Sequence, residues 1–207
     1  MTSGVGNNLN KHIKDNTSLY LLSIACIFVG MFLGVYCVKY MGQAEKNTLY
    51  EYLNKFVENM SSTSAEPKVI FIESIKNMLP MILGIWFLGL TVIGIPIILI
   101  IDIIKGFTLG FSISSLINAL GVKGIWVSVL GLIPQNIIYI PCIVFISVLA
   151  MQFSLSMVKN RLNKQWTTNV IGKIASYSLI ILICTLICFI GFFIEGYIVP
   201  VIIKIVV

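Results

Sequence analysis

Residues 78–101 read MLPMILGIWFLGLTVIGIPIILII and contain no charged side chain. The hydrocarbon core of a bilayer is about 30 Å thick, and about 20 apolar residues of α-helix are needed to cross it. Backbone N–H and C=O groups find no water at that depth, and a helix pairs them within one segment. The stretch therefore predicts a transmembrane helix.

The whole chain has the composition of a membrane protein. Of its 207 residues, 58% are hydrophobic and 11% are charged, whereas soluble domains have about 25% charged residues. The long runs are apolar on both faces, which excludes the alternating strands of a transmembrane β-barrel. The net charge of +6 comes from basic residues scattered beside these runs, which favours contacts with anionic lipids over nucleic-acid binding. We expect an all-α integral membrane protein.

The apolar runs predict about five transmembrane helices. A cytoplasmic N-terminal tail at 1–17 precedes a first span at 18–38, and a long polar segment follows at 39–77. A glycine-rich transmembrane bundle then occupies 78–207, with spans at 78–101, 106–120, 137–158 and 174–194 and a half-helix at 125–133. We expect Asp102 and Lys105 to mark the turn between the second and third spans and to pair at the membrane interface.

The segment 159–173 sets the predicted orientation, because it has four basic residues and no acidic one. Short loops rich in Lys and Arg stay in the cytoplasm. By alternation over five spans, the N-terminus is cytoplasmic, whereas the 39–77 segment and the C-terminus are external.

The polar segment 39–77 is predicted to form an external helical hairpin. In its first arm, apolar residues recur at helical spacing and form a stripe that we take as the candidate partner-binding surface: Leu49, Leu53, Phe56 and Val57. Pro67 is suited to open a second short helix that leads to the membrane.

Small residues four positions apart lie in the first and third spans. They are Gly30 and Gly34, and Gly106, Gly110 and Ser114. This spacing lets helix backbones approach closely in a membrane, where dispersion drives association. It fits either packing between helices of one chain or self-association into a homodimer.

Pro134, Gln135 and Asn136 interrupt a long apolar stretch, and Pro141 follows. A proline at membrane depth removes a backbone hydrogen bond, and the two amides can pair with the freed groups. The pattern predicts a broken or re-entrant helix at 133–141. It is either a structural turn or, as in the broken helices of transporters, part of a polar path.

The sequence contains no recognisable catalytic constellation. The sole histidine, His12, lies in the polar tail, no nucleophile has a base nearby, and no glycine-rich phosphate loop is present. The five cysteines lie in apolar segments and are best interpreted as small hydrophobic residues, too few in ligand partners for a metal site. We expect no enzymatic activity, no cofactor and no metal.

Three motifs resemble one known family. Residues 77–79 at the entry of the second span, 105–111 at the start of the third, and 132–137 at the predicted break resemble stage II sporulation protein M of endospore-forming bacteria. The resemblance covers nearly the whole chain. The wider family often has a histidine, a glycine and a downstream glutamate after the proline, whereas this chain has Gln135 and Asn136 there.

The resemblance implies a non-enzymatic membrane scaffold for engulfment, the migration of the mother-cell membrane around the forespore. Its implied partners are two peptidoglycan-degrading proteins, stage II sporulation proteins D and P, which it recruits to the septal membrane. The alternative from the residues alone is a small membrane transporter or export-channel subunit that uses the break at Pro134.

Overall fold

The computed structural model describes the backbone of residues 11–61, 67–162 and 170–201, and the side chains of these ranges except 56–61 and 160–171. Every regular element in this part of the chain is a helix. The structure is therefore all-α wherever it is described, as the sequence predicts.

Five helices are long and apolar enough to cross a membrane, which confirms the predicted fold class. The first is α2 (Thr17–Tyr40), and after α3 (Gln43–Ser61) come α4 (Pro67–Gly89) and α5 (Gly94–Leu120). The fourth span joins α6 (Val122–Val127), a π-helical turn η1 (Ser128–Leu132) and α7 (Ile133–Leu162). The fifth joins α8 (Val170–Phe193) and a π-helical turn η2 (Ile194–Ile198).

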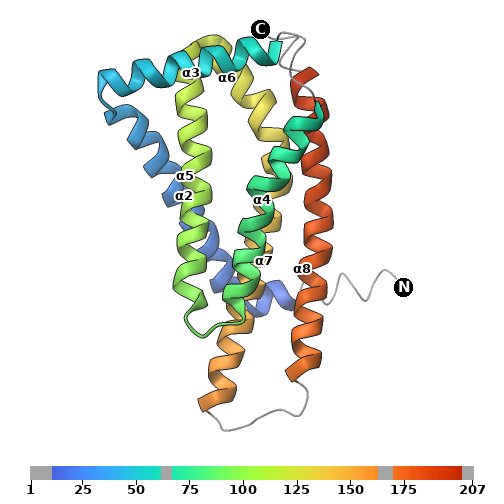
Figure 1. The fold of residues 1–207 in the computed structure, drawn as a ribbon. Helices are drawn as coiled ribbons and strands as arrows, with labels where there is room; N and C mark the ends of the chain where they lie inside the picture. Colours follow the sequence, from blue (N-terminus) through green and yellow to red (C-terminus); the bar gives the residue numbers. More distant parts are fainter. Residues whose placement is uncertain (1–10, 62–66, 163–169, 202–207) are drawn as a thin grey trace.

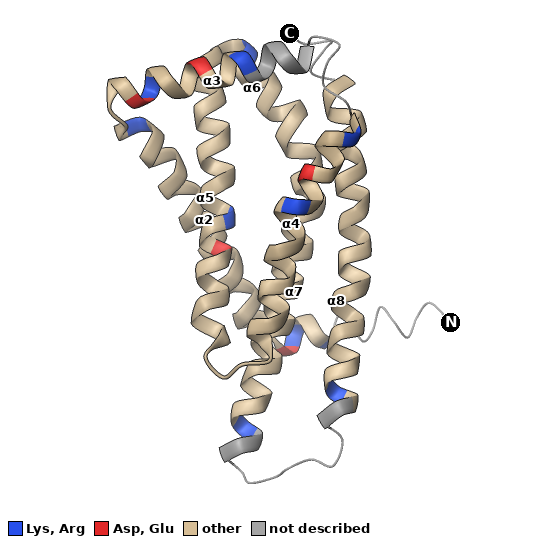
Figure 2. Ribbon diagram, in the orientation of Figure 1, with Lys and Arg blue, Asp and Glu red and all other residues tan. Residues whose placement is uncertain are grey.

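The spanning helices form one bundle, and α3 lies across one of its ends (Figure 1). α4, α5, α7 and α8 run along the long axis of the bundle, whereas α2 crosses α5 at an angle. Figure 2 shows that most charged positions lie near the ends of the bundle, with exceptions on α4 and α5. This distribution is the one expected of a protein whose middle section faces hydrocarbon.

α7 is the central helix of the bundle. Half of the residues in the apolar section of its span are buried, whereas the buried share in the other four spans is 22% to 33%. It contacts α2, α4, α5 and α8, and its side chains Ile143, Ile146 and Met151 are fully buried in the main core. The other helices can therefore be described by how they pack around α7.

The turn between the second and third spans is not where we predicted it. The chain turns at residues 90–93, and Asp102 and Lys105 lie inside α5, which has 27 residues. Two signals mark the true turn. A side chain at Gly94 would overlap the carbonyl oxygen of Leu88, and Pro96 lies in the first turn of α5, where its missing N–H costs no helical hydrogen bond. The prediction was wrong because it took charged residues as the sign of a turn.

The small residues of the first and third spans pack against each other within the chain. A methyl group at Gly30 would overlap the backbone of Ile103, and one at Gly106 would overlap the backbone of Ile27. Gly34 and Gly110 make equally close contacts across the same interface, and Ser114 is buried. α2 and α5 therefore use this face on each other, and it is not free for a second copy.

The polar segment 39–77 contains one surface helix instead of a two-helix hairpin. α3 is the first arm, but Pro67 begins α4, which continues through the membrane to Gly89. The second arm is thus the first part of a spanning helix. α4 therefore contains Glu73 and Lys76, two residues that we had expected to lie outside the second span.

At the expected broken or re-entrant helix, 133–141, the structure has a change of helix type and no interruption of the chain's helical path. η1 and α7 follow one another directly, Pro134 is the second residue of α7, and Pro141 lies within that helix. Pro134 has no N–H to donate to the preceding turn, and the π-helical turn before it accommodates the irregularity. The half-helix predicted at 125–133 is the beginning of the fourth span.

Candidate functional site

α5 carries two charged side chains, Asp102 and Lys105, in the middle of its length (Figure 2). Ionisable groups at this depth are costly and usually have a partner or a function. Asp102 is fully buried and Lys105 is half-buried, and no ion pair joins them. The predicted pairing of the two at the membrane interface is therefore wrong, and each has its own surroundings.

Asp102 accepts hydrogen bonds from two serines on two other helices. Ser23 of α2 donates to Oδ2 at 2.6 Å, and Ser147 of α7 donates to Oδ1 at 2.7 Å. All three side chains are fully buried. A carboxyl group whose two oxygens are both paired in this way links α2, α5 and α7, which indicates a structural role for Asp102.

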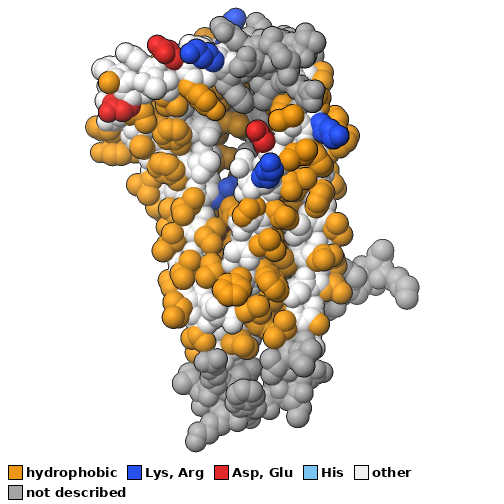
Figure 3. Space-filling model, viewed as in Figure 1, with side chains coloured by type: hydrophobic (Ala, Val, Ile, Leu, Met, Phe, Trp, Pro, Cys, Tyr) orange, Lys and Arg blue, Asp and Glu red, His pale blue; other side chains and the backbone are white. Residues whose placement is uncertain are grey.

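Lys105 faces a cleft of about 840 Å³ between α4, α5, α7 and η2, which we call the lateral cleft. Figure 3 shows the surface hollowed between α4 and α5, on the side of the bundle nearer α3. The volume falls within the range of about 300 to 1,000 Å³ that is usual for pockets that bind small molecules. Its polar lining comprises Ser74, Asn77, Lys105, Thr108, Ser112, Gln135, Asn136, Tyr139 and Glu195.

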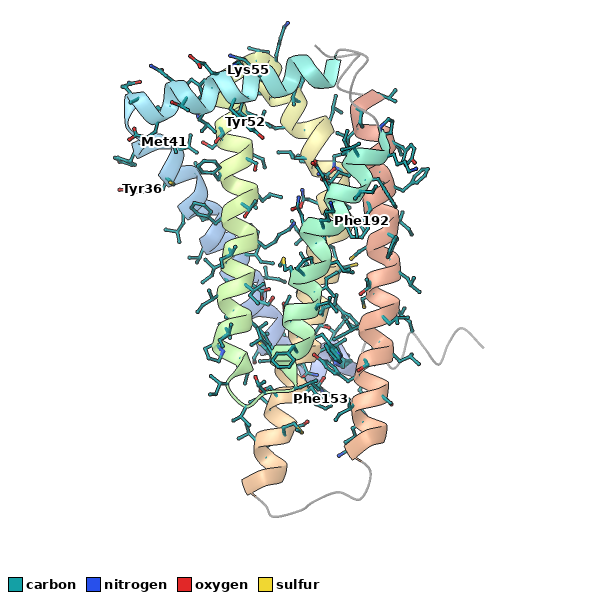
Figure 4. All side chains as sticks on the ribbon, in the orientation of Figure 1. Tyr36, Met41, Tyr52, Lys55, Phe153 and Phe192 are labelled. Atoms are coloured by element: carbon teal, nitrogen blue, oxygen red, sulfur yellow. The ribbon has the colours of Figure 1, made fainter. Side chains whose placement is uncertain are left out.

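Lys105, Tyr139 and Glu195 come together on one wall of the cleft. The Lys105 ammonium lies 5.4 Å from the centre of the Tyr139 ring, within the range of a cation–π interaction. The Tyr139 hydroxyl donates to Glu195 Oε2 at 2.8 Å, and its ring packs on the fully buried Phe192, labelled in Figure 4. Glu195 thus lines the cleft from η2, within the fifth span, and is half-buried.

Gln135 and Asn136 line the same cleft, 6% and 8% exposed. The Asn136 amide nitrogen donates to the carbonyl of Leu132 at 2.7 Å, one turn earlier. The side-chain oxygens of both residues, Gln135 Oε1 and Asn136 Oδ1, have no hydrogen-bond partner. Both oxygens are buried below the surface of the cleft, so a molecule in the cleft does not reach them.

A smaller cavity of about 190 Å³ lies beside the cleft and shares part of its lining, including Ser74, Gln135 and Glu195. It reaches Leu116 and Val199, which belong to a small apolar cluster that Leu53 of α3 joins. The polar space therefore extends from the cleft toward the end of the bundle that α3 covers.

The predicted partner-binding stripe of α3 is directed partly at the bundle itself. Leu53 packs against the cluster of Leu116, Val127 and Val199, and Leu49 is half-buried. Phe56 and Val57 lie outside the residues whose side chains are described. Apart from Ala44, the exposed positions of α3 among the described side chains are polar or aromatic, and they include Tyr52 and Lys55, labelled in Figure 4.

Sequence reasoning missed the lateral cleft although it singled out part of its lining. Pro134, Gln135 and Asn136 were noted for their polarity, and the last two line the cleft. Lys105 and Glu195 are 90 positions apart, and no spacing rule connects them. The available signal was a basic residue inside an apolar run, which was taken as a turn. Among the described residues, no three metal-ligating side chains come together.

The chain matches a known protein family. The family model described as Stage II sporulation protein M matches residues 23–200, which contain all five spans except the first residues of α2 and the last residue of the fifth span. No curated protein and no solved structure matches the chain significantly.

Proposed function

The chain belongs to the stage II sporulation protein M family, and on that premise we propose that it is a membrane scaffold for engulfment during endospore formation. Family membership and the five spans make it a multi-pass membrane protein related to sporulation. In the proposal it binds peptidoglycan-degrading partners, stage II sporulation proteins D and P, at the septal membrane of the mother cell. It positions them and performs no chemistry of its own.

The observation that supports this proposal best is the placement of α3. The helix lies across the end of the bundle (Figure 1) and is fixed there by Leu53, which packs into an apolar cluster with residues of α5, α6 and the fifth span. Its other side presents Glu51, Tyr52 and Lys55, all exposed. We call these three residues the outer face of α3. A fixed helix with an exposed aromatic residue between charges has the composition of a protein-binding surface.

This placement changes which residues we expect the partner to contact. The stripe containing Leu53 faces the bundle, so a charge there would disturb the attachment of α3. The outer face of α3 can be changed without this effect. The proposal also requires α3 to be external, as the positive charge of segment 159–173 predicts.

Site-specific crosslinking in sporulating cells tests the proposal. A photoreactive benzoyl-phenylalanine at position 52 should crosslink to the membrane-anchored hydrolase. The same group at position 32 is the matched control, because Phe32 is 74% exposed on the spanning helix α2. Equal yields of hydrolase at the two positions, or none at position 52, would contradict an interface on α3.

The lateral cleft supports a second candidate function, a small transporter or export-channel subunit. Such a protein needs a polar cavity that reaches Gln135 and Asn136, and the cleft does so. Beyond the cleft, the bundle is filled by buried side chains such as Ile85, Ile98 and Ile146, so passage requires the helices to move. Flux into liposomes that Asn136→Leu abolishes would support transport, and the absence of flux for all small solutes tried would argue against it.

A further inference from the structure

The lateral cleft opens to the side of the bundle, toward the position of the lipid. Pro80 of α4 and Ile104 and Thr108 of α5 line it and are also exposed, so they form its rim. Next to this rim, Leu83 and Ile100 are more than half exposed and face away from the core. The rim is therefore continuous with the apolar surface that contacts hydrocarbon, and an amphiphile can enter without leaving the bilayer.

The interior of the cleft offers both a cation and an anionic acceptor. Lys105 provides an ammonium group, while Glu195 contributes a carboxylate on the same wall. Glu195 Oε2 accepts from Tyr139, and the carboxylate has further acceptor sites for N–H or O–H donors. A matching ligand carries an anionic group for Lys105 and hydrogen-bond donors a few atoms away from it.

We propose that the lateral cleft binds the headgroup of a glycerophospholipid that carries hydrogen-bond donors, with phosphatidylethanolamine the best match. Its phosphate binds Lys105, and its ammonium group donates to the carboxylate of Glu195. The acyl chains leave across the rim between α4 and α5. Phosphatidylcholine is a poor match, since its trimethylated nitrogen has no N–H to donate.

This site is independent of the outer face of α3 and of any role in engulfment. The cleft lies among α4, α5, α7 and η2, and none of its lining residues belongs to α3. The proposal concerns only the binding of a lipid in the cleft. It does not depend on whether the protein transports anything.

Native mass spectrometry of the purified full chain in detergent micelles tests the proposal. The protein is equilibrated with phosphatidylethanolamine or phosphatidylcholine of identical acyl chains, and bound lipid is counted. We expect about tenfold higher affinity for phosphatidylethanolamine, because phosphatidylcholine has no N–H to donate to the carboxylate of Glu195. Equal affinities would overturn the proposal.

Variants of the cleft locate the binding. Lys105→Met should lower the affinity for phosphatidylethanolamine about tenfold or more, and Lys105→Arg should keep most of it. Lys123→Met is the control, since Lys123 is exposed on α6 and does not line the cleft. Unchanged binding by a folded Lys105→Met protein would overturn the assignment.

A second pair of variants tests the carboxylate. Glu195→Met should reduce the preference for phosphatidylethanolamine over phosphatidylcholine. Its matched control is Glu45→Met, because Glu45 is exposed on α3 and does not line the cleft. Soluble phosphoethanolamine is added as a competitor. Displacement of the lipid at equal concentration would show that the cleft takes a free phosphate ester, and would overturn the lipid assignment.

Discussion

Removal of the two serine hydroxyls that bind Asp102 should destabilise the bundle more than the sum of the single changes. Ser23 and Ser147 donate to different carboxyl oxygens of Asp102, at 2.6 Å and 2.7 Å, and each bond joins α5 to another helix. In Ser23→Ala or Ser147→Ala, the carboxyl group keeps one donor. In the double variant it keeps none.

The expected magnitudes follow from these contacts. Hydrogen bonds between transmembrane helices contribute on average about 0.6 and at most about 1.7 kcal/mol, so each single variant should lose about 1 kcal/mol. A buried acceptor without any partner costs about 1 to 3 kcal/mol more, so the double variant should lose about 3 to 5 kcal/mol. The excess over the sum of the single losses is the coupling between the two serines.

Reversible unfolding in mixed detergent micelles, followed by circular dichroism, measures these free energies. Ser176→Ala is the control, because Ser176 is exposed and its hydroxyl donates to a carbonyl of its own helix at 3.0 Å. It should change the free energy of unfolding by less than about 0.5 kcal/mol. A double variant as stable as the unchanged protein would refute the assignment of Asp102 as the link between three helices.

Three further predictions follow from the packing and from the placement of α3. Gly106→Leu should lower the melting temperature sharply, because its side chain would overlap the backbone of α2. Gly84→Ala should be nearly neutral, since the added carbon meets nothing within 4 Å beyond the nearby backbone of its own helix. Thermal unfolding in detergent compares the two variants, and equal shifts would contradict the α2–α5 contact. Tyr139→Phe removes the donor to Glu195 and should cost about 1 kcal/mol in the same assay; no loss would mean that the bond does not contribute. Tyr52→Cys in a cysteine-free background should react with a membrane-impermeant maleimide added to intact protoplasts, and protection until lysis would place α3 in the cytoplasm.

The fold class was predictable because it depends on local composition. Each spanning run has few charged residues and is long enough to cross a bilayer. Both properties are evident from consecutive residues of the sequence. The turn at 90–93 was missed because it is almost entirely apolar, while Asp102 and Lys105 looked like a boundary. Gly94 and Pro96 were visible signals, but glycine and proline are also common inside membrane helices.

The lateral cleft depends on contacts between distant parts of the chain. The polarity of Gln135 and Asn136 is evident in the sequence, but they line a cleft only together with Lys105 and Glu195, which other elements supply. The glycine spacing likewise predicted close helix packing without identifying the partner helix. Spacing alone cannot distinguish a contact within the chain from a contact between two copies.

Co-purification from sporulating cells tests the proposed scaffold most directly. The protein and a variant with Tyr52→Ala and Lys55→Glu are purified after mild crosslinking, and the amount of bound stage II sporulation protein P is measured relative to the amount of scaffold. We predict that the variant inserts normally and loses most of the hydrolase, while Lys123→Met retains it. Undiminished recovery of the hydrolase with the Tyr52 and Lys55 variant would contradict the account.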